Sequence, residues 1–230
     1  MNNPWLDLPA GPPYVAPADA ELLHAFNRSE PQLHRFDLSL FPEPFFGDPA
    51  ALVVVLNLNP GWSESDAVAH ADPEFAEQTR RSLAHQLRPY PFLHLQPTCS
   101  TPGGEWWRSR TRALCDHVGF EAVARGIACV EYMPYHSRSF SAKSPSVPSQ
   151  QYGFHLVRKA MRRGAEIVLM RARRLWAEAV PELARYPRLH VAVNPRAPYL
   201  SRKNLEESYD AIALRLTANS RKHHPADAQR

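Results

Sequence analysis

Two asparagines stand directly after a short apolar run, in the stretch Asn57-Leu58-Asn59-Pro60-Gly61. Each carries an uncharged amide that donates and accepts hydrogen bonds, so the pair could hold a polar ligand or orient a water molecule. Neither can act as a general base, because the amide does not titrate at any relevant pH. The alternative interpretation is that Asn-Pro-Gly only forms a turn, since these residues favour turns in every class of protein.

The Asn-Pro dipeptide recurs near the other end of the chain. There the apolar residues 189–193 lead directly into Asn194-Pro195, and Arg196, Tyr199 and Ser201 follow soon after. Two strands that end in the same dipeptide would bring Asn59 and Asn194 to one edge of a sheet. The repetition favours a shared site over two unrelated turns.

Short apolar runs are the elements that would position these residues. Leu52 to Leu56 are too few for a free-standing helix and too uniformly apolar for a half-exposed strand, so they predict a central strand buried on both faces. Three further predicted strands lie at 127–132, 165–170 and 189–193. Because helical patterns connect them, we predict an α/β fold, a three-layer sandwich whose central four-stranded sheet is mostly parallel.

Open parallel sheets bind ligands beyond the carboxyl ends of their strands. The sequence therefore predicts a site formed near residues 57–62, 133–137 and 194–201. The middle segment contributes Tyr135 and His136, which follow the strand at 127–132.

We predict one domain over residues 1–218. A proline-rich arm at 1–17 is expected to lie on it, and residues 219–230 are expected to form a flexible polar tail. The aromatic segment 38–48 contains Pro42 and Pro44 and predicts an irregular loop before the central strand. His70 and His85 are too far apart for a helical metal pair, so we expect both on the surface.

Composition limits the class of protein. Three widely spaced cysteines, Cys99, Cys115 and Cys129, form no CxxC pair and predict free thiols in a reducing compartment. No apolar run approaches the ~20 residues of a membrane span, and no signal peptide is visible. We therefore expect a cytoplasmic protein with no membrane partner, no metal and no cofactor, and we expect a monomer.

Charge is distributed unevenly along the chain. Residues 1–150 hold 11 Lys/Arg against 16 Asp/Glu, whereas residues 151–230 hold 16 against 7. The basic C-terminal part predicts contact with a polyanion such as DNA or another nucleic acid, and an arginine-rich solvated surface is the alternative. The residues expected to contact phosphates are Arg158, Arg162, Arg171, Arg174 and Arg202.

The order of these parts resembles the uracil-DNA glycosylase superfamily over roughly residues 51–205. Its mismatch-specific branch carries Gly-Ile-Asn-Pro-Gly and Asn-Pro-Ser-Gly motifs, which are similar to 57–61 and to the segment starting at Asn194. Two positions depart from these motifs, because Asn57 stands in place of the first glycine and Arg196 in place of the serine. Three scattered cysteines cannot supply the four ligands of the branch that holds an iron–sulfur cluster.

The resemblance implies a glycosylase that flips a modified base out of DNA and hydrolyses its N-glycosidic bond. Asn59 would position the water and Asn194 would contact the base, while Glu131 or Asp66 could supply a general base. Trp62, Phe75 and Phe92 are the candidates to stack on the base. The remaining residues expected to bind substrate are Asn57, Gly61, Tyr135, His136, Arg196, Tyr199 and Ser201.

A second hypothesis keeps the fold and discards catalysis, leaving a nucleic-acid or nucleotide-binding module. A serine hydrolase is disfavoured because the chain has no G-x-S-x-G elbow. A Rossmann enzyme and a P-loop enzyme are disfavoured because neither glycine-rich motif is present.

Overall fold

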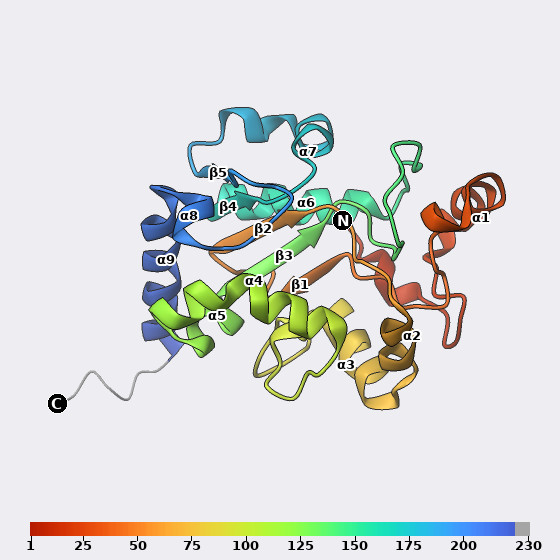
Figure 1. Cartoon of the computed structure of the whole chain (residues 1–230), viewed down its shortest axis with the longest axis horizontal. Helices are drawn as coiled ribbons and strands as arrows, with labels where there is room; N and C mark the ends of the chain where they lie inside the picture. Colours follow the sequence, from red (N-terminus) through yellow and green to blue (C-terminus); the bar gives the residue numbers. More distant parts are fainter. Residues whose placement is uncertain (224–230) are drawn as a thin grey trace.

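The apolar run after Ala51 forms β2 (Val53–Asn57), the middle strand of a five-stranded sheet in the order β1-β3-β2-β4-β5 (Figure 1). Strands β3 (Ile127–Glu131), β4 (Glu166–Leu169) and β5 (Leu189–Val191) continue the parallel part of the sheet. The structure, a computed structural model, describes residues 1–223. The predicted α/β class is confirmed.

The sheet has one strand more than the four that we predicted. The extra strand, β1 (Phe45–Gly47), runs antiparallel to β3 and makes the sheet mixed. It arises from the aromatic segment 38–48, for which we expected only a loop. Three residues are too few to show the alternation of a strand, and the preceding Pro42 and Pro44 indicate a break, so the sequence carried little signal for it.

Side chains of β2 alternate between two apolar cores, one on each face of the sheet. Val54 and Leu56 join one core, whereas Val53 and Val55 join the other, and all four are buried. This burial on both faces explains why the strand is a continuous apolar run. Helices α6 and α7 cover the first face, and α4, α5 and α9 cover the second, which gives three layers (Figure 1).

The helices follow the strands in the order expected for an α/β chain. The α-helices in residues 1–223 are α1 (Ala20–Ser29), α2 (Glu64–Ala71), α3 (Pro73–Leu83), α4 (Pro102–Val118), α5 (Phe120–Gly126), α6 (Gln150–Arg162), α7 (Arg173–Ala179), α8 (Arg202–Leu205) and α9 (Ser208–His223). Short 3₁₀ helices occupy Pro4–Asp7, Pro17–Asp19, Gln32–His34, Leu93–Leu95 and Pro181–Arg185.

The N-terminal arm packs onto the domain through aromatic side chains. Trp5 is buried and meets Tyr135 edge to face, while Tyr14 stacks on Phe41 with ring centroids 3.9 Å apart. At the other end α9 continues to His223, and the rest of the tail that we predicted from 219 lies outside the described residues. Within residues 1–223, no helix is both long and apolar enough to cross a membrane.

Candidate functional site

Polar side chains that follow β2 and β3 meet in a cavity of about 410 Å³ at the carboxyl edge of the parallel strands. The loop after β2 contributes residues 57–63, the end of β3 and its loop contribute Glu131 and 136–138, and Arg171 follows β4. Trp106 from the first turns of α4 closes one side. The ends of the three adjacent strands β3, β2 and β4 therefore meet the start of α4 at this cavity.

Asn57 and Glu131 line this cavity side by side. They are register partners at the last positions of β2 and β3, and Asn57 Nδ2 donates a 2.9 Å hydrogen bond to Glu131 Oε1. Both side chains are buried, and Asn57 Oδ1 and Glu131 Oε2 have no hydrogen-bond partner. Burial raises the pKa of Glu131 to about 8, although the hydrogen bond from Asn57 acts to lower it. Glu131 thus carries a proton at neutral pH.

Asn59 lies at the mouth of the same cavity and is half-buried. Its Nδ2 donates to Ser137 Oγ at 3.0 Å and to the carbonyl of Pro60 at 2.9 Å. These two bonds use both amide hydrogens and leave the amide oxygen as an acceptor for a ligand or a water. No carboxylate is among the hydrogen-bond partners of Asn59.

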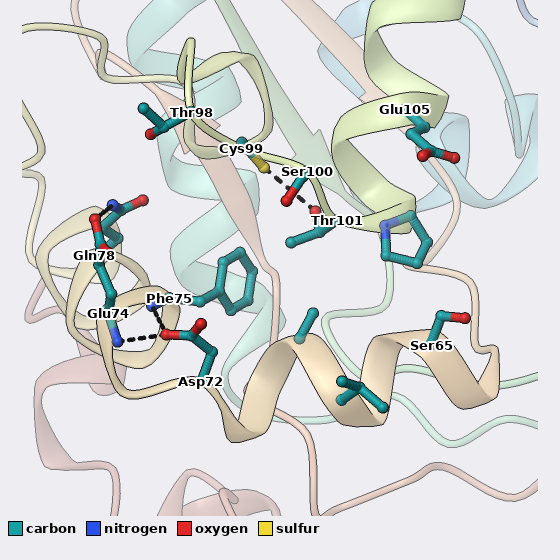
Figure 2. A pocket seen from close by; sticks show the side chains of 13 residues that line it. Ser65, Asp72, Glu74, Phe75, Gln78, Thr98, Cys99, Ser100, Thr101 and Glu105 are labelled. Carbon is teal, nitrogen blue, oxygen red and sulfur yellow. Dashed lines mark hydrogen bonds between the residues drawn. The ribbon is translucent and has the colours of Figure 1, made fainter.

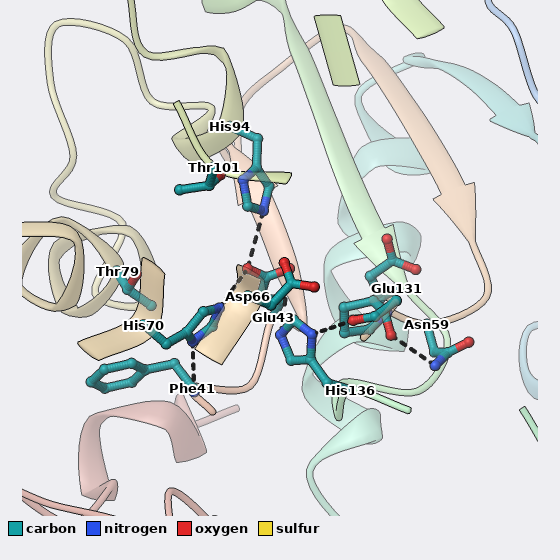
Figure 3. A network of polar contacts seen from close by, with 12 residues as sticks. Phe41, Glu43, Asn59, Asp66, His70, Thr79, His94, Thr101, Glu131 and His136 are labelled. Carbon is teal, nitrogen blue, oxygen red and sulfur yellow. Dashed lines mark hydrogen bonds and ion pairs between the residues drawn. The ribbon is translucent and has the colours of Figure 1, made fainter. Parts of the chain in front are cut away.

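A second buried carboxylate of the cavity, Glu43, is surrounded by three histidines (Figure 3). Its Oε1 is 3.1 Å from Nε2 of His94 and 3.7 Å from Nε2 of His70, and its Oε2 is 3.7 Å from Nε2 of His136. Glu43, His94 and His136 line the cavity, and all four side chains are buried.

Glu43 and the three histidines form a cluster of oppositely charged side chains that is buried away from water. Burial raises the pKa of Glu43, but the charges of the histidines, His94 first, lower it to about 2. Burial would lower the pKa of His94, but the charge of Glu43 raises it to about 10. Burial and the nearby His136 lower the pKa of His70 to about 3. A Glu43 carboxylate paired with a His94 imidazolium is therefore the stable form at neutral pH.

Ligand atoms of Glu43, His70 and His136 lie within 4.8 Å of one another, which is close enough to enclose a metal ion. The tautomer of His70 argues against that use. The Phe41 backbone N–H donates to His70 Nδ1 at 3.0 Å, so neutral His70 carries its proton on Nε2, the nitrogen that faces Glu43. A protonated nitrogen has no lone pair for a metal, and we assign the cluster to charge pairing.

Trp62 and Trp106 are two of the aromatic residues that line the cavity, together with Phe46, Trp107 and Phe140. The guanidinium of Arg138 lies 3.9 Å from the centroid of the Trp62 ring, and Trp62 Nε1 donates to Asp37. Of the three aromatic residues that sequence reasoning named, Trp62 alone lines this cavity. Phe92 is fully buried against Trp107, and Phe75 lines a different cavity.

The structure does not bring Asn194 into the cavity with Asn59. Asn194 is exposed, and its Oδ1 accepts from the backbone N–H groups of Arg196 and Ala197, which closes its own turn. Strand β4 separates β5 from β2, so the end of β5 lies about 10 Å away along the sheet. The dipeptide therefore recurs at the same edge of the sheet, but in a separate loop.

Other residues expected to bind substrate also lie apart from the cavity. Arg196 is exposed beside Asn194, and Ser201 precedes α8. The ring centroid of Tyr199 lies 4.2 Å from the guanidinium carbon of Arg110. Tyr135 is fully buried and donates to Asp19 at 2.7 Å. Gly61 and His136 do line the cavity, and they contact each other through His136 Nδ1 and the Gly61 carbonyl at 2.5 Å.

Three of the five arginines expected to contact phosphates bind carboxylates of the chain itself. Their partners are Glu182 for Arg158, Glu178 for Arg174 and Asp210 for Arg202. Arg162 is exposed on α6. Arg171 alone lines the cavity, where its buried Nε has no hydrogen-bond partner.

A second cavity, of about 560 Å³, opens between α2, α3 and the start of α4 (Figure 2). Cys99 lines it, with its thiol 3.3 Å from Thr101 Oγ1. Cys99, Cys115 and Cys129 are all free thiols.

Sequence reasoning missed Glu43 and His94 as site residues, and its placement of His70 on the surface is wrong because His70 is buried. Glu43 lies between two prolines in a segment expected to be irregular, and the three histidines come from separate segments. No spacing in the sequence relates them. A carboxylate inside a run of aromatic residues was the one available signal, because such a charge needs a buried partner.

No protein-family model matches the chain, and no curated protein or solved structure matches it.

Proposed function

We propose that the chain binds a nucleobase in the 410 Å³ cavity and hydrolyses its N-glycosidic bond, as a DNA-acting glycosylase does. The Asn57–Glu131 pair carries this proposal. Asn57 Oδ1 is an unpartnered acceptor, and protonated Glu131 offers a donor from the unpartnered Oε2. One acceptor beside one donor is complementary to the N–H and C=O edge of a lactam base such as uracil or hypoxanthine.

The surrounding residues support a hydrolytic role. Trp62 offers a ring on which the base can stack, and Asn59 offers its amide oxygen to orient a water at the anomeric carbon. Bond cleavage leaves negative charge on the departing base. The proton of Glu131 and the cation of Arg171 would stabilise that charge.

A non-catalytic nucleic-acid or nucleotide-binding module is the second candidate, and one observation favours it. Asn59 has no carboxylate among its hydrogen-bond partners, and Glu131 holds a proton at neutral pH. A water at Asn59 would then have no strong base beside it. In this case the same cavity would recognise the base without cleaving it.

Cleavage of end-labelled oligonucleotides separates the two candidates. Single-stranded and duplex substrates would carry uracil, hypoxanthine, xanthine or a mismatched thymine, and alkali would reveal abasic sites. We expect excision by the parent protein and a loss of about 10²-fold or more in Asn59→Ala and Glu131→Gln. Asn194→Ala tests whether Asn194 contacts the base, as the resemblance to the glycosylases implies. A loss of excision equal to that in Asn59→Ala would show that the loop after β5 takes part in the reaction.

Each outcome decides between the candidates. Retention of the base-containing oligonucleotide without cleavage, weakened by Asn57→Ala, would replace the glycosylase with the binding module. Neither binding nor cleavage of any substrate would overturn both. Circular dichroism and thermal melting of each variant would show whether lost function reflects lost folding.

A further inference from the structure

Cys99 stands at the end of a series of side chains that begins with Glu43 and His94 and leads away from the nucleobase cavity, which Cys99 does not line. Glu43 Oε1 lies 3.1 Å from His94 Nε2. His94 and the Cys99 thiol both pack against the first turn of α4, and each shifts the pKa of the other. His94 Nδ1 is buried and has no hydrogen-bond partner, so it is the nitrogen left to exchange a proton with sulfur. Carboxylate, imidazole and thiol in this order form the arrangement that activates a nucleophilic cysteine.

The first turn of α4 packs directly against this pair. A Cβ added to Gly103 would lie 2.5 Å from His94 Cε1, and one added to Gly104 would lie 2.9 Å from Cys99 Sγ. These two glycines therefore allow the N-terminus of a 17-residue helix to approach the imidazole and the sulfur. The partial positive charge at a helix N-terminus stabilises a thiolate.

Other contacts hold the cysteine in place. Arg108 donates from both Nη atoms to the Cys99 carbonyl, and Thr101 Oγ1 lies 3.3 Å from Sγ. Burial raises the pKa of the Cys99 thiol, but His94 and Thr101 both lower it, and the net shift of the pKa is downward. A lowered pKa increases the fraction of thiolate that is available as a nucleophile.

The cavity beside Cys99 has its own charge. Its lining includes the exposed carboxylates Asp72, Glu74 and Glu105, and it contains no lysine or arginine among the described residues. Asp72 and Glu74 come from the start of α3, and Glu105 comes from the first turn of α4. The negative potential of three carboxylates attracts a cationic ligand.

We propose that Cys99 is the nucleophile of a second, thiol-dependent site, which transfers the acyl group of a positively charged ester or amide. This site does not rest on the proposed glycosylase function, because its cavity and its nucleophile are separate. Glu43 and His94 also line the nucleobase cavity, and in the second site Glu43 positions His94.

The chemistry balances within these residues and one water. The Cys99 thiolate attacks the carbonyl carbon, and the carbonyl π electrons move to oxygen. When they return, the bond to the leaving group breaks, and that group takes the proton from His94. Neutral His94 then accepts a proton from a water that attacks the thioester, which releases the acid and regenerates the thiolate and imidazolium.

The test uses the full chain and two p-nitrophenyl esters, of Nα-benzyloxycarbonyl-lysine and of Nα-benzyloxycarbonyl-glutamate. With the lysine ester we expect a burst of p-nitrophenol and an acyl adduct on Cys99, seen by intact mass and peptide mapping. The glutamate ester should react on the order of 10-fold more slowly because of the acidic lining. Cys99→Ser should abolish burst and adduct, and Cys115→Ser, the matched control, should retain both.

Two variants distinguish a built site from an ordinary thiol. His94→Asn should return the pH profile of Cys99 alkylation by iodoacetamide to that of a free thiol with a pKa near ~8.5, whereas the parent stays reactive at lower pH. Because His94 is buried and its loss could unfold the chain, the exposed Glu105→Gln provides a second test. Glu105→Gln should reduce the ratio of the rates with the lysine and glutamate esters, and it should not lower the rate at which iodoacetamide alkylates Cys99.

Specific results would overturn the proposal. Absence of an adduct on Cys99 with either ester would remove the acyl-transfer activity. Equal alkylation of Cys99 and Cys115 across the pH range would show that His94 does not activate the thiol. If the parent reacted with both esters at equal rates and Glu105→Gln did not change their ratio, the site would have no preference for a cationic substrate. Because no oligonucleotide is involved, these failures would leave the glycosylase proposal intact.

Discussion

The side chain of Asn57 donates a 2.9 Å hydrogen bond to Glu131, and the two residues end neighbouring parallel strands at the same register position. The bond fixes one oxygen of the carboxyl group and leaves the other without a partner. It also joins the carboxyl ends of β2 and β3 where the cavity begins. The same two residues therefore make a structural contact through Asn57 Nδ2 and Glu131 Oε1 and keep Asn57 Oδ1 and Glu131 Oε2 for the recognition of a base that we propose.

Glu131 should make the protein less stable as the pH rises from about 4.5 to about 8. The folded state holds the Glu131 proton up to a pKa of about 8, whereas an unfolded glutamate releases it near 4.5, so the folded state binds more protons in this range. Glu131→Gln should flatten this part of the profile. Thermal melting at pH 5 and pH 8.5 measures it, with the exposed Glu178→Gln as control, and parallel profiles for parent and Glu131→Gln would contradict the assignment.

Loss of the Glu43 charge should destabilise the protein strongly. Glu43→Gln leaves the buried His94 cation without its carboxylate, and breaking one side of a buried pair costs about 3–5 kcal/mol. Urea unfolding measures the change. Glu182→Gln, which removes the partner of Arg158 at the surface, should cost no more than about 1 kcal/mol. Equal costs for the two variants would mean that the Glu43 pair is not buried in solution.

The same pair predicts opposite pH limits. Glu43 has a lowered pKa, so its stabilisation is present above about 4.5 and disappears as the pH falls towards 2. His94 has a raised pKa, so its stabilisation is present below about 6.5 and disappears as the pH rises through about 10. The difference in unfolding free energy between parent and Glu43→Gln should therefore be largest between pH about 4.5 and about 6.5, where both contributions are fully present.

The sequence predicted the central part of the fold because burial on both faces leaves an uninterrupted apolar run, as in β2. It also predicted that polar residues would gather beyond β2 and β3, which they do through Asn57, Asn59 and His136. It did not reveal β1, because a three-residue strand gains its identity from pairing with β3 and not from its own pattern.

Tertiary packing determined what the sequence could not show about the site. The charge cluster unites Glu43, His70, His94 and His136 from four segments, so no local period marks it. The repeated Asn-Pro suggested that Asn59 and Asn194 would meet, but a strand order with β4 between β2 and β5 keeps them in separate loops. Shared chemistry at two strand ends does not specify which strands are neighbours.

Trp62 should contribute to nucleobase binding through stacking. Trp62→Ala is expected to weaken binding of a base-containing single strand by about 1–3 kcal/mol, the range observed for base–aromatic stacking. Fluorescence anisotropy of a labelled oligonucleotide measures the affinity. Phe92→Leu, a change within the core away from the cavity, is the control and should alter stability more than affinity. Unchanged affinity in Trp62→Ala would transfer the stacking role to Trp106.

Arg171 should be the arginine that responds to an anionic ligand, because its Nε is buried in the cavity without a hydrogen-bond partner. Arg174 lies near it in sequence but is exposed and pairs with Glu178 at 2.8 Å. If Arg171 neutralises one phosphate, Arg171→Ala should reduce the slope of log affinity against log salt by about 0.7–0.9. Arg174→Ala should leave the slope nearly unchanged. Titrations of a labelled single strand at several salt concentrations measure both slopes. If only Arg174→Ala changed the slope, the phosphate contact would lie on the outer surface of α7, and the cavity would bind the base without its backbone.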